Sequence, residues 1–338
     1  MSISANVFPL EQVSHLSIEQ CLAELASNAN LPLNLQLDSD TLSHNDAQAP
    51  LSNIELVVFS DISVKQLLSL QSKGQITICA LTAINHRNQQ SSYRFSVTCL
   101  DFINSRKAIA KLALENNFEA ALLKSVPTLA EPGLLVMDMD STTIEIECID
   151  EIAKLAGTGE LVSEVTERAM LGELDFAQSL HQRVATLEGS SEQILVEVAK
   201  NIPLMAGLEN LIHELKKHNW RIAIASGGFT YFADHLKDLL SLDATFANQL
   251  EIIEGKLTGK VLGSVVDAQV KADSLAILSE RYQISKNQTV AMGDGANDLV
   301  MMAAAAFGVA FHAKPIVLAQ ADSSIHHQGL DCLLHWLA

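Results

Sequence analysis

Short apolar runs alternate with amphipathic stretches throughout the C-terminal two thirds of the chain. Residues 133–138 (GLLVMD) and 221–226 (RIAIAS) have the length and composition of buried strands. Similar runs occur at 289–294 and 307–311, and the stretch 207–220 repeats apolar residues at helical spacing. Strands that alternate with helices in this way predict an α/β fold with a doubly wound parallel sheet.

The first third of the chain has a different pattern. Short β-like runs precede one amphipathic helix, which predicts a small α+β domain. The runs are residues 55–60, 75–81 and 93–100, and the helix is 104–118. We expect this domain to span residues 1–126 and a second domain to span 134–338, because the PTLAEPG segment between them has the composition of a linker. Within the second domain, residues from about 146 to 205 have a mostly helical pattern.

Acidic residues are concentrated in the second predicted domain. The chain has a formal net charge of -18, and residues 131–338 carry 14 Lys and Arg against 29 Asp and Glu. This charge argues against nucleic acid as a partner, since a phosphate backbone needs basic side chains to neutralise it, and against anionic membrane surfaces. It is consistent with bound divalent cations, or simply with an acidic enzyme that stays in solution.

The sequence also gives an expectation for location. The first Lys or Arg is Lys65, so the positively charged start of a secretory signal is missing. The longest apolar run, 301–311, is about half of the roughly 20 residues needed to cross a bilayer. The five cysteines include no C-x-x-C pair, a pattern typical of free thiols in a reducing compartment. We therefore predict a cytoplasmic protein without a membrane partner.

Three of the predicted strands end in polar clusters, with the sequences DMDST, SGG and GDGAND. The carboxyl ends of parallel strands lie at one edge of a sheet, so we expect these clusters to lie together. They contain four carboxylates: Asp138, Asp140, Asp294 and Asp298. Such a group is costly unless a cation neutralises it, and oxygen ligands without His or Cys favour Mg²⁺.

Two further features indicate that the site binds a phosphoryl group. The SGG cluster begins at Ser226 and offers a hydroxyl and backbone N–H groups at the start of a predicted helix, which suits an anion. Lys271, in the first turns of another predicted helix, adds a positive charge. Taken singly, each cluster has a structural explanation, because Asp and Ser commonly cap a helix after a strand. Together, a metal site, an anion cradle and a cation around a carboxylate indicate phosphoryl transfer.

These motifs resemble those of a known family. DMDST, SGG, Lys271 and GDGAND match, in order and spacing, the four signature motifs of the haloacid dehalogenase superfamily over residues 134–312. The longer stretch from Asp138 to Val184 is similar to the phosphoserine-hydrolysing members of the superfamily, in their longer bacterial form. The resemblance implies a Mg²⁺-dependent phosphatase with a Rossmann-like core, a helical cap inserted at about 146–205 and an ACT-like N-terminal domain.

The resemblance also implies the roles of the acidic residues. Asp138 would be the nucleophile that accepts the phosphoryl group as an aspartyl-phosphate. Asp140 would protonate the leaving serine oxygen and then deprotonate the water that breaks the intermediate. Mg²⁺ would be held by the Asp138 carboxylate, the Asp140 backbone carbonyl and Asp294, and Asp298 would support it through water or through contacts with the direct ligands.

The remaining implied roles concern the substrate, O-phospho-L-serine. The phosphoryl oxygens would be held by Ser226, the Gly227 backbone and Lys271, with Asn297 positioning Lys271 or the phosphate. In the cap, Glu147 would bind the substrate ammonium and Arg183 would bind its carboxylate through a bidentate contact. Met170 and Phe176 would form an apolar lid that excludes water.

Several alternatives stay open at this point. The implied reaction is hydrolysis of phosphoserine, the last step of serine biosynthesis, but another small phosphomonoester, such as phosphothreonine or a phosphorylated sugar acid, would suit the same motifs. A phospho-accepting protein similar to a receiver is a third alternative, although receivers lack a second Asp two residues beyond the acceptor. Without the resemblance, Glu147 and Arg183 would be read as surface charges of helices, whereas the resemblance favours the substrate roles. An ACT-like domain would bind an amino acid or pair two copies of the chain as a homodimer.

Overall fold

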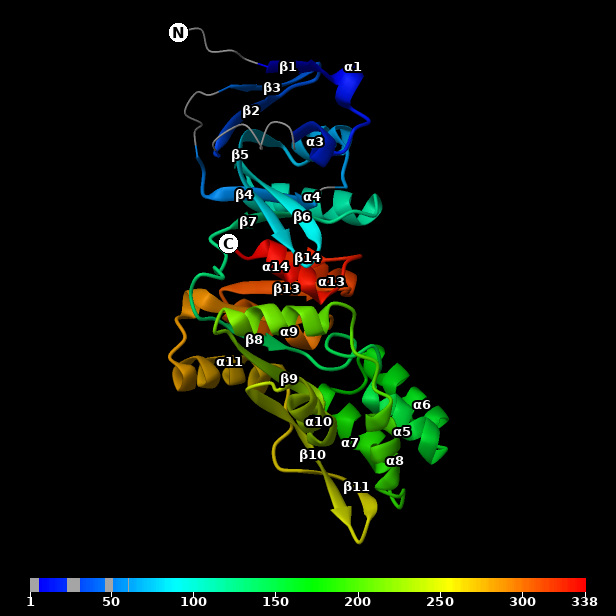
Figure 1. Ribbon diagram of the computed structural model, residues 1–338. Coiled ribbons are helices and arrows are strands. Elements are labelled where there is room, and N and C mark those ends of the chain that lie inside the picture. Colours follow the sequence, from blue (N-terminus) through cyan, green and yellow to red (C-terminus); the bar gives the residue numbers. More distant parts are fainter. Residues whose placement is uncertain (1–5, 23–30, 46–50, 60) are drawn as a thin grey trace. The chain divides into compact units, whose positions relative to one another are not determined.

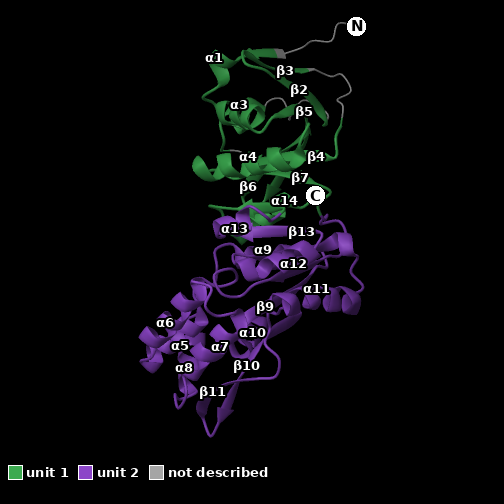
Figure 2. Ribbon diagram, turned by 180° about the vertical axis from the view of Figure 1, so that it is seen from behind, with its two compact units in different colours: residues 1–126, 322–338 green, residues 127–321 purple. Residues whose placement is uncertain are grey.

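A computed structural model describes residues 6–22, 31–45, 51–59 and 61–338. The chain divides into two compact units, which Figure 2 shows in different colours. Unit 1 comprises residues 1–126 and 322–338, and unit 2 comprises residues 127–321. From the sequence we expected residues 322–338 to belong to the second domain, whereas in the structure they belong to unit 1. The domain assignment as a whole stays a prediction.

The strands of unit 2 lie side by side in the order β11-β10-β9-β8-β12-β13 (Figure 1). Strands β10, β9, β8, β12 and β13 pair in parallel, and β11 pairs antiparallel with β10. The bounds are β8 (Leu134–Met137), β9 (Arg221–Phe229), β10 (Ala244–Ile253), β11 (Lys256–Leu262), β12 (Thr289–Gly293) and β13 (Phe307–Phe311). All four side chains of β8 are buried, as expected for a central strand covered on both faces. The predicted α/β fold with a parallel sheet is confirmed.

Helices connect the parallel strands, and a group of four is inserted after β8. The connecting helices are α9 (Leu208–Lys217), α10 (Thr230–Leu240), α11 (Ala268–Tyr282), α12 (Leu299–Ala304) and α13 (Pro315–Leu318). The inserted helices are α5 (Cys148–Ala156), α6 (Gly159–Met170), α7 (Phe176–Ala185) and α8 (Gln193–Lys200). Helix α7 begins at a capping box formed by Asp175 and Gln178, and α5 ends at Gly157, whose φ of +74° favours glycine. No helix among the described residues is both long and apolar enough to span a membrane.

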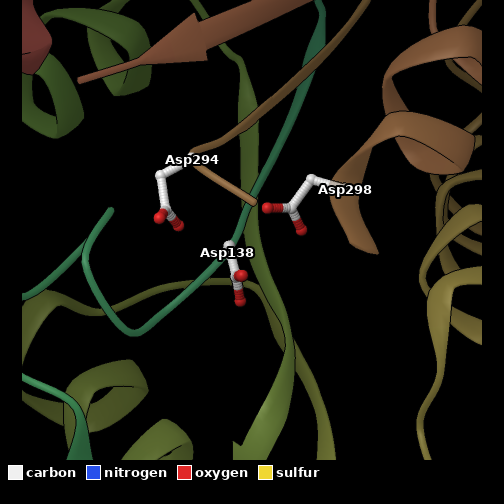
Figure 3. Close-up of side chains that lie close together, drawn as sticks. All are labelled: Asp138, Asp294 and Asp298. Carbon is white, nitrogen blue, oxygen red and sulfur yellow. The ribbon is translucent and has the colours of Figure 1, made fainter. Parts of the chain in front are cut away.

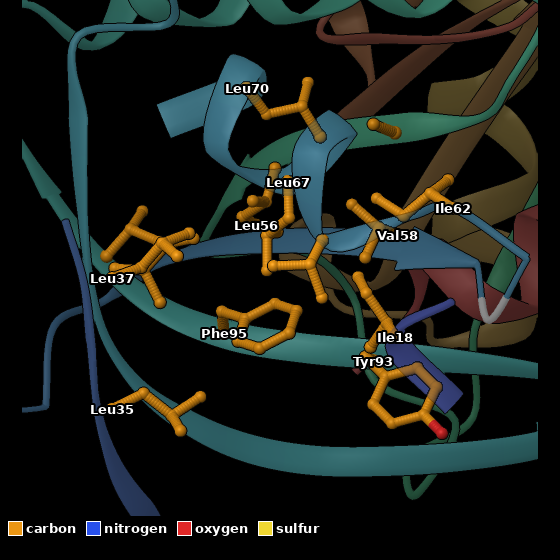
Figure 4. Packing of buried hydrophobic residues seen from close by; sticks show 14 of the residues in the cluster. Ile18, Leu35, Leu37, Leu56, Val58, Ile62, Leu67, Leu70, Tyr93 and Phe95 are labelled. Carbon is orange, nitrogen blue, oxygen red and sulfur yellow. The ribbon is translucent and has the colours of Figure 1, made fainter. Parts of the chain in front are cut away.

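Unit 1 contains an antiparallel sheet with the strand order β1-β3-β2-β5-β6-β4-β7. The bounds are β1 (Asn6–Pro9), β2 (Leu33–Leu37), β3 (Thr41–Asn45), β4 (Ile54–Phe59), β5 (Ile76–Arg87), β6 (Gln90–Cys99) and β7 (Ala120–Lys124). Its helices include α1 (Leu10–Val13), α3 (Val64–Lys73) and α4 (Phe102–Glu115). Leu56 and Phe95 from the sheet and Leu70 from α3 belong to one buried apolar cluster (Figure 4). This arrangement is α+β, and the ACT-like relationship stays a prediction.

Residues 322–338 belong to unit 1 because buried charged groups of that unit bind their main chain. The segment contains β14 (Ser323–Ile325) and α14 (Leu333–Trp336). Nη2 of Arg94 donates to the carbonyl oxygens of residues 335, 336 and 337 at 3.1, 2.8 and 2.7 Å, while its Nη1 contacts Glu55 at 2.5 Å. Oε1 of Glu119 accepts the N–H groups of residues 326–328. Nothing in the apolar pattern of this segment indicated these partners.

His335 gives unit 1 a pH-dependent stability. Burial, and then the charge of Arg87, lower its pKa from 6.5 to about 4, and its Nδ1 lies 2.8 Å from Ser92 Oγ. Below pH 6.5 the unfolded chain binds a proton that the folded chain excludes, so stability is full above that pH and falls as the pH approaches 4. We expect this residue to account for about 3 kcal/mol of that loss.

Urea unfolding of the wild type and His335→Gln between pH 4 and 7 checks this prediction. Glutamine retains hydrogen-bonding capacity toward Ser92 but does not titrate in this range. The free energy of unfolding should fall less steeply with decreasing pH in the variant. Equal slopes in the two proteins would contradict the role assigned to His335.

Candidate active site

Asp138 and Asp140 are held in place by the main chain around the end of β8. The N–H of Asp138 donates to Met292 O at 2.9 Å, which extends the pairing of β8 with β12 by one residue. One carboxylate oxygen of Asp138 accepts the N–H of Met139 at 2.7 Å, and one of Asp140 accepts the N–H of Cys148 at 3.0 Å. The two aspartates are thus fixed at the carboxyl edge of the sheet, where the sequence predicted them.

A cluster of three carboxylates occupies this edge, formed by Asp138, Asp294 and Asp298 (Figure 3). One oxygen from each lies within 4.8 Å of the others. The three residues come from the end of β8, the end of β12 and the short 3₁₀ helix η2 (Ala296–Asp298). Nζ of Lys271, from α11, lies 2.8 Å from both Asp138 Oδ2 and Asp298 Oδ1. A set of hard oxygen donors at this spacing fits a divalent cation such as Mg²⁺.

The electrostatics of the cluster also fit a cation. Burial and the charge of Asp138 raise the pKa of Asp298 to about 7, and the same two causes raise the pKa of Asp294. Burial alone would lower the pKa of Lys271, but the carboxylates of Asp138 and Asp298 raise it overall, so the ammonium stays charged. One ammonium does not balance three carboxylates, and further positive charge would stabilise their ionised forms.

Asp140 has the properties of a residue that gives and takes a proton near neutral pH. Burial, followed by the charge of Glu147, raises its pKa to about 7. The carboxylate lines the same pocket as Asp138. It is not part of the three-carboxylate cluster, so of the four predicted acidic residues only its side chain is left for proton transfer.

The SGG segment lies within β9, whereas the sequence placed it at the start of a helix. Helix α10 begins at Thr230, and the N–H of Gly228 donates to Ser226 Oγ at 2.9 Å rather than being free. The two glycines are required by close approach: a Cβ on Gly228 would lie 2.8 Å from Asp140 Oδ2, and one on Gly227 would lie 2.5 Å from the ring of Phe176. Any side chain here would displace a residue of the site.

One pocket collects most of the predicted site residues. Those that line it are Asp138, Asp140, Glu147, Phe176, Arg183, Ser226, Gly227, Asp294 and Asn297. Lys271 and Asp298 are fully buried beside it, bonded to each other. Met170 is 77% exposed and lies outside the pocket, in a neighbouring hollow with Phe176 and Arg183. The structure therefore places Met170 outside the pocket that contains Asp138.

Glu147 and Arg183 provide opposite charges in the pocket. Glu147 precedes α5 and accepts the hydroxyl of Ser141 at 2.9 Å, and burial raises the pKa of its carboxyl group. Arg183 lies on α7, where burial lowers the pKa of the guanidinium, and its buried Nε has no hydrogen-bond partner among the described residues. An ammonium and a carboxylate on one small ligand would complement this pair.

The sequence reasoning missed several residues that line the pocket, including Gly228, Phe229, Leu180 and Lys314. Gly228 is the last residue of the SGG cluster and Phe229 follows it directly. Leu180 lies one helical turn before Arg183 on α7, so the sequence offered a signal for all three positions. Lys314 follows β13 at the same edge of the sheet as Asp294. The strand-end argument used for the other clusters would have found it had it been extended to this strand.

A doubly wound parallel sheet whose central strand ends at a carboxylate cluster beside a buried lysine is an arrangement suited to phosphoryl transfer. The family model described as haloacid dehalogenase-like hydrolase matches residues 133–306. This chain belongs to that family.

Similar proteins agree with this assignment. The phosphoserine phosphatase of Vibrio cholerae is 56% identical over 239 residues, which cover 70% of this chain and 72% of that protein. A crystal structure of a probable phosphoserine phosphatase from Vibrio cholerae superposes with a TM-score of 0.73 and 46% identity, over 84% of this chain and 86% of that one. A phosphoserine phosphatase solved as a phospho-aspartyl intermediate analogue gives a TM-score of 0.58 and 39% identity, over 62% of this chain and all of that one.

Proposed function

We propose that this enzyme hydrolyses O-phospho-L-serine to L-serine and phosphate, as the last step of serine biosynthesis. The observation that carries the substrate assignment is the pairing of Glu147 and Arg183 in the pocket that contains Asp138. Phosphoserine presents an ammonium, a carboxylate and a phosphoryl group, and the pocket offers a complement to each. Pairing of two copies through residues 1–126 and a cytoplasmic location stay predictions.

The reaction proceeds in two displacements at phosphorus. In the first, a carboxylate oxygen of Asp138 forms a bond to phosphorus while the bond from phosphorus to the serine oxygen breaks, and Asp140 gives that oxygen a proton. In the second, Asp140 takes a proton from water, whose oxygen bonds to phosphorus as the bond to Asp138 breaks. The pKa of about 7 suits Asp140 to both proton transfers.

Mg²⁺ would be held by the Asp138 carboxylate, the Asp140 backbone carbonyl and Asp294, with Asp298 supporting the site. When bound, the ion supplies positive charge that offsets the negative charge on the carboxylates and the phosphoryl oxygens. Ser226, the Gly227 backbone and Lys271 would contact those oxygens, and Asn297 would position them. Phe176, which lies over Gly227, would exclude water from the reacting atoms, while the exposed Met170 would have to move to do so.

Replacing Arg183 tests the substrate assignment. Loss of a buried charged contact to the substrate carboxylate should lower kcat/KM of Arg183→Ala for phosphoserine by about a hundredfold. Hydrolysis of p-nitrophenyl phosphate, which has no carboxylate, should change by less than about threefold, because that contact is not used. Steady-state kinetics of both substrates provide the measurement, with Arg168→Ala as a control, because this half-buried arginine of α6 does not line the pocket.

Three outcomes decide between the candidate functions. Preference of the wild type for phosphoserine over phosphothreonine and phosphoglycolate supports the proposal. Preference for either of the other two would transfer it to a different small phosphomonoester. A stable phospho-protein that forms without turnover would support a receiver-like role instead.

A further inference from the structure

Lys314 lies at the carboxyl edge of the sheet beside the carboxylate cluster. It follows the end of β13 by three residues, as Asp294 follows the end of β12 by one. Its backbone N–H donates to the carbonyl oxygen of Asp294 at 3.2 Å, and its side chain lines the pocket that also contains Asp138. The main-chain contact therefore fixes a lysine at the opening of the site.

The charges that line the pocket are unbalanced. The acidic side chains are Asp138, Asp140, Glu147 and Asp294, and the basic ones are Arg183 and Lys314. Arg183 comes from the inserted helices, so Lys314 is the cation that the sheet and its connections contribute to the lining. Unlike Lys271, Lys314 is exposed and takes part in none of the ion pairs among the described residues.

Lys314 adds a positive charge to a pocket lining that is otherwise mostly acidic. A phosphate dianion that approaches a chain of net charge -18 meets repulsion, which one exposed cation at the pocket offsets locally. The position, exposure and lack of an ion-pair partner therefore suit Lys314 to bind an anionic ligand.

We infer that Lys314 binds the phosphoryl group of the incoming phosphomonoester and the inorganic phosphate that leaves, a role that rests on the proposed function. Its ammonium contacts the phosphoryl oxygens from the solvent side, opposite to the buried Lys271. Because the contact is made with the bound substrate and with the product alike, it contributes to binding more than to the chemical step.

Kinetics of Lys314→Ala and Lys314→Arg test this inference. In Lys314→Ala, the KM for phosphoserine and the inhibition constant of inorganic phosphate should both rise about tenfold or more, as expected for a lost charged contact. The value of kcat should stay within about threefold, since uniform binding is what is removed. Lys314→Arg should recover most of the affinity. Lys286→Ala is the matched control, because this exposed lysine precedes β12 at the opposite edge of the sheet.

Two results would overturn the inference: Lys314→Ala behaving like Lys286→Ala, or a fall in kcat at unchanged KM and unchanged phosphate inhibition. Thermal unfolding of each variant shows whether it retains the wild-type fold. Inhibition of p-nitrophenyl phosphate hydrolysis by inorganic phosphate keeps the two proposals distinguishable. If the wild type fails to hydrolyse phosphoserine, the proposed substrate is wrong, while the phosphate inhibition constants still decide the role of Lys314.

Discussion

Asp138→Asn is expected to abolish turnover, with a loss of at least about 10⁴-fold in kcat. The amide is neutral and a poor nucleophile, so the bond to phosphorus cannot form at a useful rate. The side chain keeps its size, and its oxygen can still accept the N–H of Met139, so the fold should be retained. Phosphate release from phosphoserine, measured beside the thermal unfolding of the variant, checks the result.

The matched control is Asp101→Asn, which makes the same chemical change at the N-cap of α4 in unit 1. Asparagine caps helices as well as aspartate does, so activity and stability should both be preserved. Acid quenching after addition of labelled phosphoserine should trap a phospho-protein in the wild type and none in Asp138→Asn. Turnover above about 1% of the wild-type rate in Asp138→Asn would be incompatible with nucleophilic catalysis by this residue.

Lys271→Met is expected to cost both activity and stability. The ammonium is fully buried between Asp138 and Asp298, so its removal leaves two buried carboxylates without their cation. Breaking a buried ion pair from one side typically lowers the free energy of unfolding by about 3–5 kcal/mol. Urea unfolding in buffer without divalent cations measures the loss, and added Mg²⁺ should restore part of it.

A double variant separates the two effects. Lys271→Met combined with Asp298→Asn removes the cation together with one carboxylate, while the amide oxygen can still accept the N–H of Gly295. The double variant should recover much of the lost stability, because the effects of two substitutions in a contacting pair are not additive. It should recover none of the lost activity, because Lys271 is still absent. If the double variant were less stable than Lys271→Met, the charge imbalance would not be the cause.

The sequence was sufficient to predict that Asp138, Asp294 and Asp298 lie together, because strand ends leave a local signature. An apolar run that stops at an Asp, as at Asp138 and Asp294, identifies both the strand and its functional end. Lys271 could be assigned to the same site because it places a positive charge in the first turns of a predicted helix. The confirmed α/β fold and hydrolase family follow from such short-range patterns.

Features set by distant packing were beyond the reach of the sequence. Met170 is an apolar residue at the end of a helix. The sequence around it does not show whether its side chain covers the pocket or lies in solvent. The backbone conformation of the SGG cluster depends on the close approach of Gly228 to Asp140. These two residues are far apart along the chain, so the sequence pattern does not show the approach. Likewise, the apolar residues of 322–338 suit any core, and only the positions of Arg94 and Glu119 show which unit they complete.

The inclusion of residues 322–338 in unit 1 has a consequence for the order in which the protein matures. A ribosome delivers residues 1–126 first, but Arg94 and Glu119 then lack the main-chain groups that compensate their burial. Burying these charges without their main-chain partners is costly, so unit 1 reaches its final state only after residues 322–338 have emerged. Unit 1 is therefore completed by a segment that is translated after residues 127–321.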